Sequence, residues 1–486
     1  MTKNFIFNDN EETFFDSVKS YIQKKNKQKL YKILFKNDKL LIFKDDIIVE
    51  IIMNKIKYKP RTFSIAENLK YSLQIQVINN IDIFIDEMVE KICCSYSSSE
   101  IKSIINDMPL LNEFSTSSVD LSEYSIIWRD HFLEENIGLL NSFVKMGIKP
   151  HNILALDKGD STKHRKEITE TFKSLGYQTR VMDNAFLNID RETENYKTIL
   201  SDFLKTKNDK KVIILDDGAI VTGLLEDNLF KKILFAVELT EMGLRRIKKL
   251  KSLPCKIYNL AKSDLKKLFT YKEVASSVFY RIMDLLGAKK TIGRTVIILG
   301  YGDLGSMLAK FLRDVGLKVV IVDLDYKKLI LAAENGFETY KVLSKAINIE
   351  QPFLVVGTSG YYSITYDDLL LLPNNTYVTS AATADVKIFE NIKDSIHSEI
   401  IGYGRRYLIN NKYITLLGNG RSINLYDSEA IPNQSNDLFK AATLLTVING
   451  IQQNSSDKTL DLDIVNEWLD KSNIYKSYYN RYISME

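Results

Sequence analysis

The most constraining feature of the sequence is residues 294–325, RTVIILGYGDLGSMLAKFLRDVGLKVVIVDLD. Its run of apolar, largely β-branched residues, Thr295–Leu299, predicts a buried parallel strand. A glycine-rich turn, Gly300–Gly305, follows it, and helical periodicity then continues to Val315. A second apolar strand is expected at Lys318–Val322. Together these segments predict a βαβ unit, which commits this part of the chain to a parallel sheet flanked by helices.

The three glycines of the turn are expected to have separate roles. Gly300 permits the tight turn, Gly302 leaves room for a pyrophosphate against the backbone, and Gly305 allows close helix–strand contact. The phosphates would lie on the N–H groups of the helix that begins at Asp303–Leu304. Asp323 lies 18 residues after the last glycine and is placed to accept hydrogen bonds from both ribose hydroxyls. A carboxylate there repels a 2′-phosphate, so the sequence predicts NAD rather than NADP as the cofactor.

Length and composition limit the remaining possibilities. A chain of 486 residues is expected to form two or three domains. The net charge of +4, from 66 basic and 62 acidic residues, does not indicate binding to nucleic acid or an anionic membrane. No apolar stretch approaches the ~20 residues that cross a bilayer, and three cysteines make neither a disulfide framework nor a metal site. We therefore expect a cytoplasmic protein with no metal that acts on a small molecule.

Residues 1–100 read as a separate α+β module without site chemistry. Phe14–Ile22 is helical in pattern, and Leu40–Phe43 and Ile47–Met53 predict a β-hairpin around an Asp-Asp turn. The serine-rich segment Ser95–Ser99 is typical of a linker.

Residues 101–271 alternate strands with helices and predict a parallel sheet of the kind found in substrate-binding α/β domains. His131–Met146 is expected to be a helix. Its spacing would place His131 and Glu135 on one face, at positions i and i+4.

Loops after two predicted strands of this sheet carry polar residues. Ser161 and Thr162 follow the strand Asn152–Leu156, and Asp217 follows the strand Val212–Leu215. Because ligands bind at the carboxyl ends of parallel strands, these three residues are candidates for a site.

Residues 272–425 are expected to form the NAD-binding domain around the glycine turn. Its strand Phe353–Val356 ends in Thr358, Ser359 and Gly360, a small-residue turn that suits close approach by a dinucleotide.

The last part of the chain is expected to return to the first parallel sheet. Ile414–Leu417 and Ile423–Asn424 would complete the second sheet, and residues 426–486 would be helical. The helix Phe439–Ile451 is expected to pack on the first sheet. The predicted fold class is α/β, with two doubly wound, Rossmann-like domains joined by a hinge and a small α+β N-terminal module.

Four segments, in order, give the chain its resemblance to a known family. Over roughly residues 107–450 the sequence resembles S-adenosylhomocysteine hydrolase. The matching segments are VIILDDG (212–218), VELTEMGLRRI (237–247), ILGYGDLG (298–305) and ITLLGNGRSINL (414–425). The resemblance implies a substrate domain, an NAD domain and a hinge between them, in a homo-oligomer with tightly held NAD. It also implies that NAD⁺ oxidises a nucleoside 3′-hydroxyl, after which a base removes the 4′ proton, the 5′ substituent leaves, and water adds.

Carried over position by position, the resemblance implies roles for particular residues. The implied catalytic residues are His131, Asp217 and Lys266, and the implied substrate contacts are Glu135, Ser161, Thr162 and Asn424. The implied or predicted NAD contacts are Thr240, Gly300, Gly302, Asp303, Leu304, Gly305, Asp323, Thr358, Ser359, Gly360 and Asn424.

Several positions depart from the family pattern. Leu239 stands where the family has a glutamate, Thr270 where it has the aspartate paired with the lysine, and Thr383 and Ile431 where it has histidines. Glu241, Met242, Tyr271 and Ala275 also differ near the nicotinamide. Leu239 and Ile431 can only pack, and each lost polar partner of a nucleoside costs ~1–3 kcal/mol.

Three functions stay open at this point. The first is an NAD-dependent enzyme acting on a nucleoside or thioether nucleoside through 3′-oxidation, with altered specificity. The second is a catalytically silent NAD-binding regulatory or partner-binding protein, and the third is an ordinary dehydrogenase with exchangeable NAD. Taken singly, His131 could also be a core histidine, Asp217 a turn former and Lys266 a solvated lysine.

Overall fold

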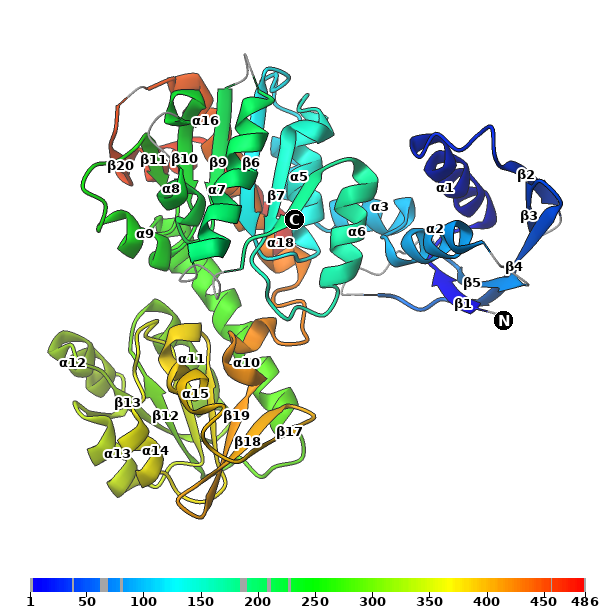
Figure 1. Cartoon of the computed structure of the whole chain (residues 1–486). Helices are drawn as coiled ribbons and strands as arrows, with labels where there is room; N and C mark the ends of the chain where they lie inside the picture. The colour runs from blue at the N-terminus through cyan, green and yellow to red at the C-terminus, as the bar shows by residue number, and fades with distance from the viewer. Residues whose placement is uncertain are drawn as a thin grey trace.

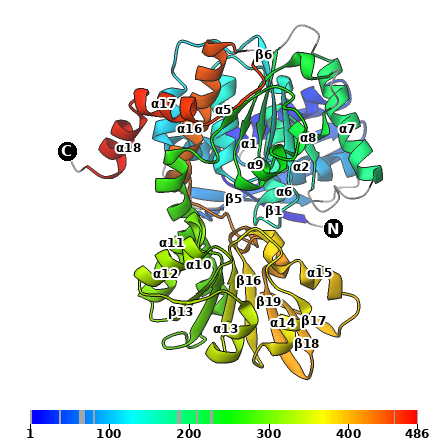
Figure 2. The same ribbon diagram turned by 90° about the vertical axis from the view of Figure 1, so that its left-hand side faces the viewer.

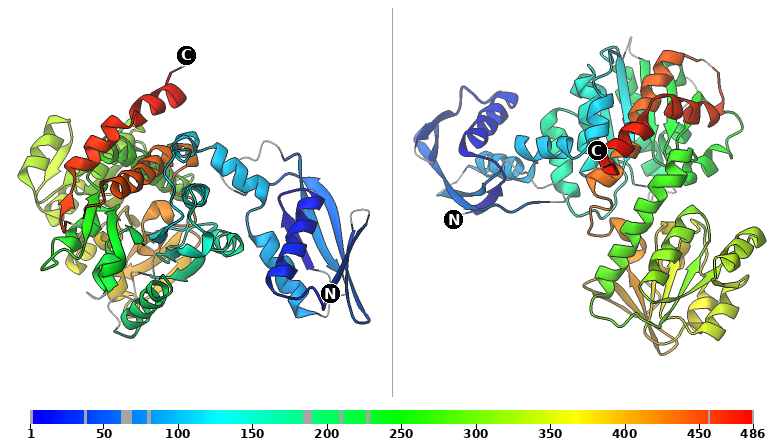
Figure 3. Two further views of the ribbon diagram at one scale, coloured as in Figure 1. Left: turned by 90° about the horizontal axis from the view of Figure 1, so that it is seen from above. Right: turned by 180° about the vertical axis from the view of Figure 1, so that it is seen from behind.

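The computed structural model describes residues 3–36, 39–61, 69–78, 82–183, 190–207, 211–225, 229–455 and 457–484. Three sheets organise these residues (Figure 1). A small antiparallel sheet lies at the N-terminal side, and a seven-stranded and an eight-stranded sheet form the two larger bodies. Seen from above, the small sheet with its helices projects away from the rest of the chain (Figure 3). The predicted α/β fold class, with its extra α+β module, is confirmed.

The small sheet is antiparallel throughout, and helices α1 (Glu11–Lys24) and α2 (Ile83–Cys94) pack with it around one core. The predicted hairpin is confirmed, with an Asp45-Asp46 turn between two of its strands. In spatial order the strands are β1 (Lys3–Phe7), β5 (Tyr71–Ile78), β4 (Ile47–Lys57), β3 (Lys39–Lys44) and β2 (Lys32–Lys36).

The expected serine linker, Ser95–Ser99, is correct for Ser95–Ser97, a non-helical connection after α2 where the chain passes from the core of the small sheet to that of the next body, but Ser98 and Ser99 already belong to a helix. Ser97 is the N-cap of helix α3 (Ser98–Asn106), and its hydroxyl accepts from the N–H of Glu100 while the Glu100 carboxylate accepts from the N–H of Ser97. Ser95 and Ser97 are buried. Serine is as well suited to a helix cap as to a linker. The Ser97 hydroxyl also donates to the Asn8 carbonyl at 2.6 Å, and the Asn8 amide donates to Glu100 at 2.8 Å, so these contacts tie the connection to the small module.

The seven-stranded sheet is parallel throughout. Its spatial order is β20 (Leu460–Asp461), β11 (Lys256–Asn259), β10 (Ile233–Glu238), β9 (Lys211–Asp216), β6 (Tyr124–Asp130), β7 (Ile153–Asp157) and β8 (Gln178–Val181). One face packs with α3, α4 (Pro109–Phe114), α5 (Glu135–Lys145), α6 (Arg165–Leu175) and the C-terminal helices. The other packs with α7 (Asp190–Lys205), α8 (Ile220–Leu224) and α9 (Glu241–Ile247).

The helix expected at His131–Met146 begins four residues later, at Glu135. The segment before it forms the strand β6, whose residues Ser125–Asp130 are all buried, and His131 lies in the loop after that strand. Glu135 is the first residue of α5. The run Ile126-Ile127-Trp128 suits a strand buried on both faces, which the helical pattern of the following residues obscured. His131 and Glu135 therefore do not share a helix face.

The eight-stranded sheet contains the glycine turn at the end of its interior strand β12 (Thr295–Leu299). It is parallel except for the edge strands β18 and β17, which form an antiparallel extension that the sequence did not predict. Its spatial order is β14 (Glu338–Tyr340), β13 (Lys318–Val322), β12, β15 (Leu354–Gly357), β16 (Thr376–Ser380), β19 (Lys412–Leu417), β18 (Gly404–Ile409) and β17 (Ser398–Ile401).

Helices cover both faces of this sheet, as a doubly wound fold requires. One face packs with α10 (Tyr271–Leu286), α11 (Asp303–Asp314) and α12 (Tyr326–Glu334), and the other with α13 (Leu343–Glu350), α14 (Tyr366–Leu371) and α15 (Ile388–Ile392).

Two segments connect the larger bodies. Helix α10 crosses from the seven-stranded to the eight-stranded sheet, and the chain returns after β19 (Figure 1, Figure 2). Ile423–Leu425 is a short 3₁₀ turn on this return, so the expectation that Ile423–Asn424 completes the second sheet is wrong. Helix α16 (Asn433–Gln453) packs against the seven-stranded sheet, as expected.

The C-terminal helices α17 (Asp463–Lys471) and α18 (Ile474–Tyr482) pack against the same body. Arg481 pairs with Glu113 at 2.7 Å, and the Tyr482 hydroxyl donates to Asp437 at 2.7 Å. In the described ranges, no helix is long and apolar enough to cross a membrane.

Candidate active site

One cavity of about 2000 Å³ lies between the two larger sheets. Its walls come from both: loops after β6, β7, β9 and β10 on one side, and the loops after β12, β13 and β15 on the other. Because these are the carboxyl ends of parallel strands, they form the edge at which α/β sheets bind ligands. The cavity is large enough for a dinucleotide and a second small molecule.

The glycine turn shapes the dinucleotide end of this cavity. Gly300 has φ = +103°, a conformation that favours glycine. A Cβ on Gly305 would lie 2.1 Å from the Gly300 carbonyl oxygen, so the helix α11 can approach the strand only without a side chain there. A Cβ on Gly302 would meet nothing within 4 Å and would occupy open space at the start of α11. This arrangement fits a pyrophosphate that contacts bare backbone.

Asp323 lies at the end of β13 and faces the same cavity. Its carboxylate accepts from the N–H of Tyr301 at 2.7 Å and from the N–H of Asp325 at 2.9 Å. The carboxylate thus stabilises the glycine turn. Each oxygen has a second lone pair that could accept from a ribose hydroxyl.

Thr358, Ser359 and Gly360 line the cavity after β15. The Thr358 hydroxyl donates to the Gly300 carbonyl at 2.8 Å. The N–H groups of Ser359 and Gly360 donate to buried Asp385, at 3.2 and 3.0 Å. The turn is therefore held in place by a carboxylate that the sequence analysis did not single out.

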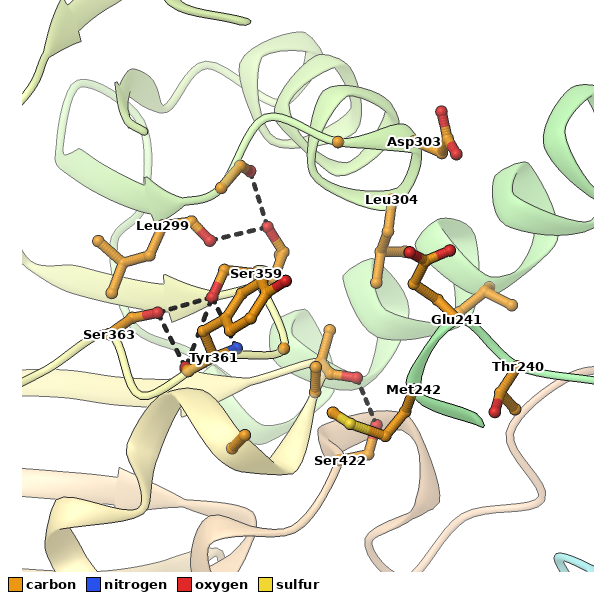
Figure 4. A pocket seen from close by; sticks show the side chains of 18 of the residues that line it. Thr240, Glu241, Met242, Leu299, Asp303, Leu304, Ser359, Tyr361, Ser363 and Ser422 are labelled. Carbon is orange, nitrogen blue, oxygen red and sulfur yellow. Dashed lines mark hydrogen bonds between the residues drawn. The ribbon is translucent and has the colours of Figure 1, made fainter. Parts of the chain in front are cut away.

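An arginine of the seven-stranded body reaches across to this turn. Arg245 of α9 donates to the carbonyls of Gly360 and Ser359 at 3.2 and 3.3 Å, and its guanidinium lies 3.9 Å from the centre of the Tyr361 ring. Figure 4 shows Tyr361 and Ser359 on one side of this pocket, with Glu241, Met242 and Thr240 opposite. The loops that line the cavity thus contact one another directly.

The remaining predicted NAD contacts also line the cavity. Asp303 and Leu304 lie at the start of α11 (Figure 4). The Thr240 hydroxyl caps α9 by accepting from the N–H of Gly243 and donates to Glu238 at 2.8 Å. Asn424 is buried and accepts from the Ser422 hydroxyl at 2.8 Å.

A cluster of charged side chains forms the opposite end. His131 Nδ1 lies 2.5 Å from Asp160, and its Nε2 lies 3.2 Å from Lys158 Nζ and 3.7 Å from Asp217. Lys158 pairs with Asp217 at 2.5 Å. The structure therefore brings the predicted residues His131 and Asp217 together, although from two strand ends rather than from a helix.

The charges in this cluster alter one another's pKa values. Burial and Lys158 lower the pKa of His131, but the Asp160 and Asp217 carboxylates outweigh them, so it lies above its ordinary value. Burial raises the pKa of Asp217, but Lys158 and His131 hold it well below its usual range. Asp160 is shifted in the same direction, chiefly by His131 against the effect of burial. Asp217 and Asp160 are ionised at neutral pH.

Glu135 belongs to a second charged group beside the first. Its carboxylate accepts from the Asn436 amide at 3.0 Å and lies 3.8 Å from Lys440 Nζ, which pairs with Asp130 at 3.1 Å. Burial, only partly offset by Lys440, raises the pKa of Glu135 to about 7. An apolar wall lies beside this group and consists of Leu133, Leu425, Ala430, Ile431 and Val274. A polar edge next to apolar walls is a suitable environment for a flat heterocycle.

Lys266 extends into the cavity from a short π-helical turn, Lys266–Thr270. Its ammonium donates to the Leu239 carbonyl and lies 4.6 Å from the centre of the Phe439 ring. Burial lowers the pKa of Lys266 to about 8, against the opposing effect of Asp217 and Glu238. Within the described residues Lys266 forms no ion pair, which is consistent with Thr270 at the position of its expected carboxylate partner. A lysine in this state can act as a base near neutral pH.

Two predicted substrate residues lie elsewhere. Ser161 and Thr162 line a smaller depression of about 630 Å³ beside the cavity, and neither lines the cavity itself. The Thr162 hydroxyl donates to the Phe132 carbonyl at 3.2 Å. The side chain of Thr383, one of the departures from the family pattern, lies outside the described residues.

Sequence reasoning missed Lys158, Asp160 and Lys440. Lys158 and Asp160 follow β7 directly, so the rule for strand ends could have found them. Lys440 is 3% exposed and interrupts an apolar helical run, a pattern that indicates a paired buried charge. Asp130, His131 and Asp217 could together surround a metal ion, but Lys440 and Lys158 already neutralise the two carboxylates. We assign no metal to them.

Comparisons with known proteins point to one family. A family model described as "S-adenosyl-L-homocysteine hydrolase, NAD binding domain" matches residues 268–430. The adenosylhomocysteinase of Thermotoga maritima is 23% identical over 361 residues, which cover 70% of this chain and 84% of that protein. Adenosylhomocysteinase of Thermoplasma acidophilum is 26% identical, over 48% of this chain and 59% of its own length.

The S-inosyl-L-homocysteine hydrolase of Methanocaldococcus jannaschii is 28% identical, over 50% of this chain and 60% of its own length. The chain thus spans less than two thirds of this relative and of the Thermoplasma protein. Among solved structures, the dipicolinate synthase chain of Bacillus halodurans aligns with a TM-score of 0.38 and 14% identity, over 67% of this chain and 99% of that one.

Proposed function

We propose that this chain, a divergent member of the S-adenosylhomocysteine hydrolase family with NAD as its cofactor, is an enzyme that acts on a nucleoside or thioether nucleoside through transient 3′-oxidation. Bound NAD⁺ supplies the oxidant for the 3′-hydroxyl and, once reduced, returns the electrons at the end of the cycle. Residues 101–271 would form the substrate domain and residues 272–425 the NAD domain, with residues 426–486 returning to the former.

The observation that carries the proposal is the placement of Lys266. It lies in the same cavity as the glycine turn and the His131–Asp217 cluster, with a pKa of about 8. A base of this strength can remove the proton at C4′ once the neighbouring 3′-carbon is a ketone. Phe439 and the Leu239 carbonyl hold its ammonium in place.

The other charged groups have proposed roles around the nucleoside. Glu135 and Asn436 would contact the edge of the base, which would lie against Leu133 and Ile431. His131 and Asp217 would lie near the 5′ substituent, where proton transfer to the leaving group is needed. The contact between Arg245 and the Ser359–Tyr361 turn would exclude water while the cofactor is reduced.

The proposal is tested by single-turnover absorbance. NAD-loaded protein is mixed with adenosine, inosine, S-adenosylhomocysteine or S-inosylhomocysteine, and NADH is followed at its absorption maximum. At least one of these compounds should reduce the bound NAD, and Lys266→Met should retain NAD while no longer releasing a thiol from a thioether nucleoside. If none of the four reduces NAD, the proposed 3′-oxidation of these substrates is wrong.

A second candidate is an NAD-binding protein without catalysis. Two residues favour it, Leu239 and Ile431, which stand where the family has polar residues. Their side chains are 3% and 8% exposed and pack in apolar clusters, so neither can form a hydrogen bond with a nucleoside. In that case the small N-terminal module would serve as the interaction surface. Capture of a partner that requires both residues 1–100 and NAD, together with no NADH formation, would favour this candidate.

A further inference from the structure

Four polar side chains form a continuous row along the cavity wall. In order they are Asp160, His131, Lys158 and Asp217, and the distances between successive members are 2.5, 3.2 and 2.5 Å. The first and last members, Asp160 and Asp217, are carboxylates, and burial alone would disfavour their ionised forms. The middle two, His131 and Lys158, both line the cavity.

The hydrogen-bond roles in this row restrict where protons can lie. Because Asp160 accepts, the Nδ1 of His131 carries a hydrogen. The Nε2 faces Lys158 Nζ, and an ammonium can only donate. A second proton on His131 would therefore point at another donor, because the carboxylate near Nε2, that of Asp217, lies 3.7 Å away, beyond hydrogen-bond distance. The contact is satisfied when Lys158 donates to neutral His131, and a proton on Nε2 requires Lys158 to accept it in turn.

We propose that His131 and Lys158 hold one proton between them, and that Lys158 is thereby a further proton-transfer residue of this site. The two carboxylates at the ends of the row retain this proton, because each lies beside one of the two possible cations. The position of the shared proton follows from the hydrogen-bond geometry alone, whereas the role of Lys158 in proton transfer rests on the proposed function.

Other charged groups face the row from every side but do not replace either member. They are Asp130 on β6, Glu135 on α5, Lys440 on α16, Lys266 on its π-helical turn and Arg421 on the return segment. Asp130 pairs with Lys440, and Arg421 lies 3.4 Å from Asp183. Arg129 on β6 also faces the row, and its guanidinium donates to the Asp217 carbonyl at 2.5 Å. With two carboxylates and one shared proton the row has a net charge of −1, which the surrounding cations offset.

In the proposed reaction the shared proton has a defined path. When Lys266 takes the 4′ proton, the electron pair forms the C4′–C5′ double bond, and the C5′–X bond breaks with its pair leaving on X. The shared proton moves onto X, where X is the 5′ substituent. In the addition, water oxygen bonds to C5′, one water proton returns to the His131–Lys158 pair, and Lys266 returns its proton to C4′.

The first experiment does not depend on activity. The chain has four histidines, so imidazole ¹⁵N shifts can be assigned with His131→Asn as the reference. In the full NAD-loaded protein, neutral His131 should be the Nδ1–H tautomer. In Lys158→Met the pKa of His131 should rise by roughly one to three units, since a neighbouring cation is lost. Lys166→Met, a lysine of the same segment whose partner is Glu90, should leave it unchanged.

A second variant separates charge from proton sharing. Lys158→Arg keeps a cation beside His131 but cannot give up a proton. It should preserve the titration of His131 and the NADH burst with S-adenosylhomocysteine, yet slow thiol release by roughly 10²- to 10⁴-fold. If Lys158→Arg releases thiol as fast as the unaltered protein, proton transfer by Lys158 is wrong.

The outcomes distinguish this inference from the proposed function. An Nε2–H tautomer of His131, or a pKa that does not move in Lys158→Met, would overturn proton sharing whatever the activity. If His131 shows the Nδ1–H tautomer and its pKa rises in Lys158→Met, but no nucleoside reduces NAD, then His131 and Lys158 share a proton and the proposed reaction is wrong.

Discussion

The two ends of the cavity differ in the groups that line them: main-chain atoms at one end and charged side chains at the other. At the glycine turn, the backbone of Gly300–Gly305 shapes the pocket, and one carboxylate, Asp323, stabilises it. At the other end, side chains from the end of β6, the loops after β6, β7 and β9, and helix α16 supply the chemistry. The comparison shows that a backbone site tolerates divergence in the surrounding sequence. A side-chain site depends on each paired charge, as Lys440 beside Asp130 and Lys158 beside Asp217 illustrate.

The largest effect should come from removing the base at the side-chain end. Lys266→Met should lower the rate of 4′ proton removal by roughly 10²- to 10⁴-fold without loss of bound NAD. In the unaltered protein this rate should rise as pH passes through about 8, since only the neutral amine accepts a proton. Solvent exchange of the substrate 4′ proton, followed by NMR between pH 6.5 and 9, measures both. A flat pH profile would remove Lys266 as the base.

Removing Lys440 should show how strongly the side-chain end depends on paired charges. Lys440→Met leaves Asp130 and Glu135 buried without their cation, and should lower the free energy of unfolding by roughly 3–5 kcal/mol at pH 8. The loss should be smaller at pH 6. Glu135, with a pKa already raised to about 7 and raised further without Lys440, is then mostly protonated. Urea titrations at both pH values test this, with exposed Lys471→Met as a control that should change little.

A substitution in the glycine turn should affect binding and leave folding intact. Gly302 has φ = −86° and open space beside it, so Gly302→Ala should fold normally. The added methyl group would occupy the expected place of the pyrophosphate and weaken NAD binding by roughly tenfold or more, about 1.4 kcal/mol. Calorimetric titration with NAD measures this. Gly402→Ala, also in open space but away from the cavity, is the matched control. Equal NAD affinity in both variants would show that the pyrophosphate does not pass Gly302.

The smallest effect is expected at the contact between Arg245 of the seven-stranded body and the turn after β15. Arg245→Ala removes two hydrogen bonds to the Ser359–Gly360 turn and the contact with Tyr361. Bound NAD should then dissociate faster by roughly fivefold, about 1 kcal/mol. Stopped-flow displacement of NAD measures the rate, and exposed Lys249→Ala should leave it unchanged. A rate equal to that of the unaltered protein would mean that this contact does not retain the cofactor.

Much of the fold could be predicted because it depends on local patterns. The strand at Thr295–Leu299, the glycine turn and the hairpin before Met53 each follow from residue type and spacing over a few positions. The strand β6 was missed because a run buried on both faces has no period that distinguishes it from the start of a helix. The linker at Ser95–Ser99 was predicted two residues too long, because serine suits a loop and the first turn of a helix equally well.

The sequence alone determined the βαβ unit, the identity of the cofactor and the candidates His131, Asp217 and Lys266. These depend on backbone conformations that glycine permits and on residue types that the chemistry requires. Only the tertiary structure decided that His131 meets Asp160 and Lys158, that Lys440 neutralises Asp130, and that Ser161 and Thr162 lie outside the cavity. Distances between charges on different strands set their pKa values and protonation states, and a linear pattern carries no information on those distances.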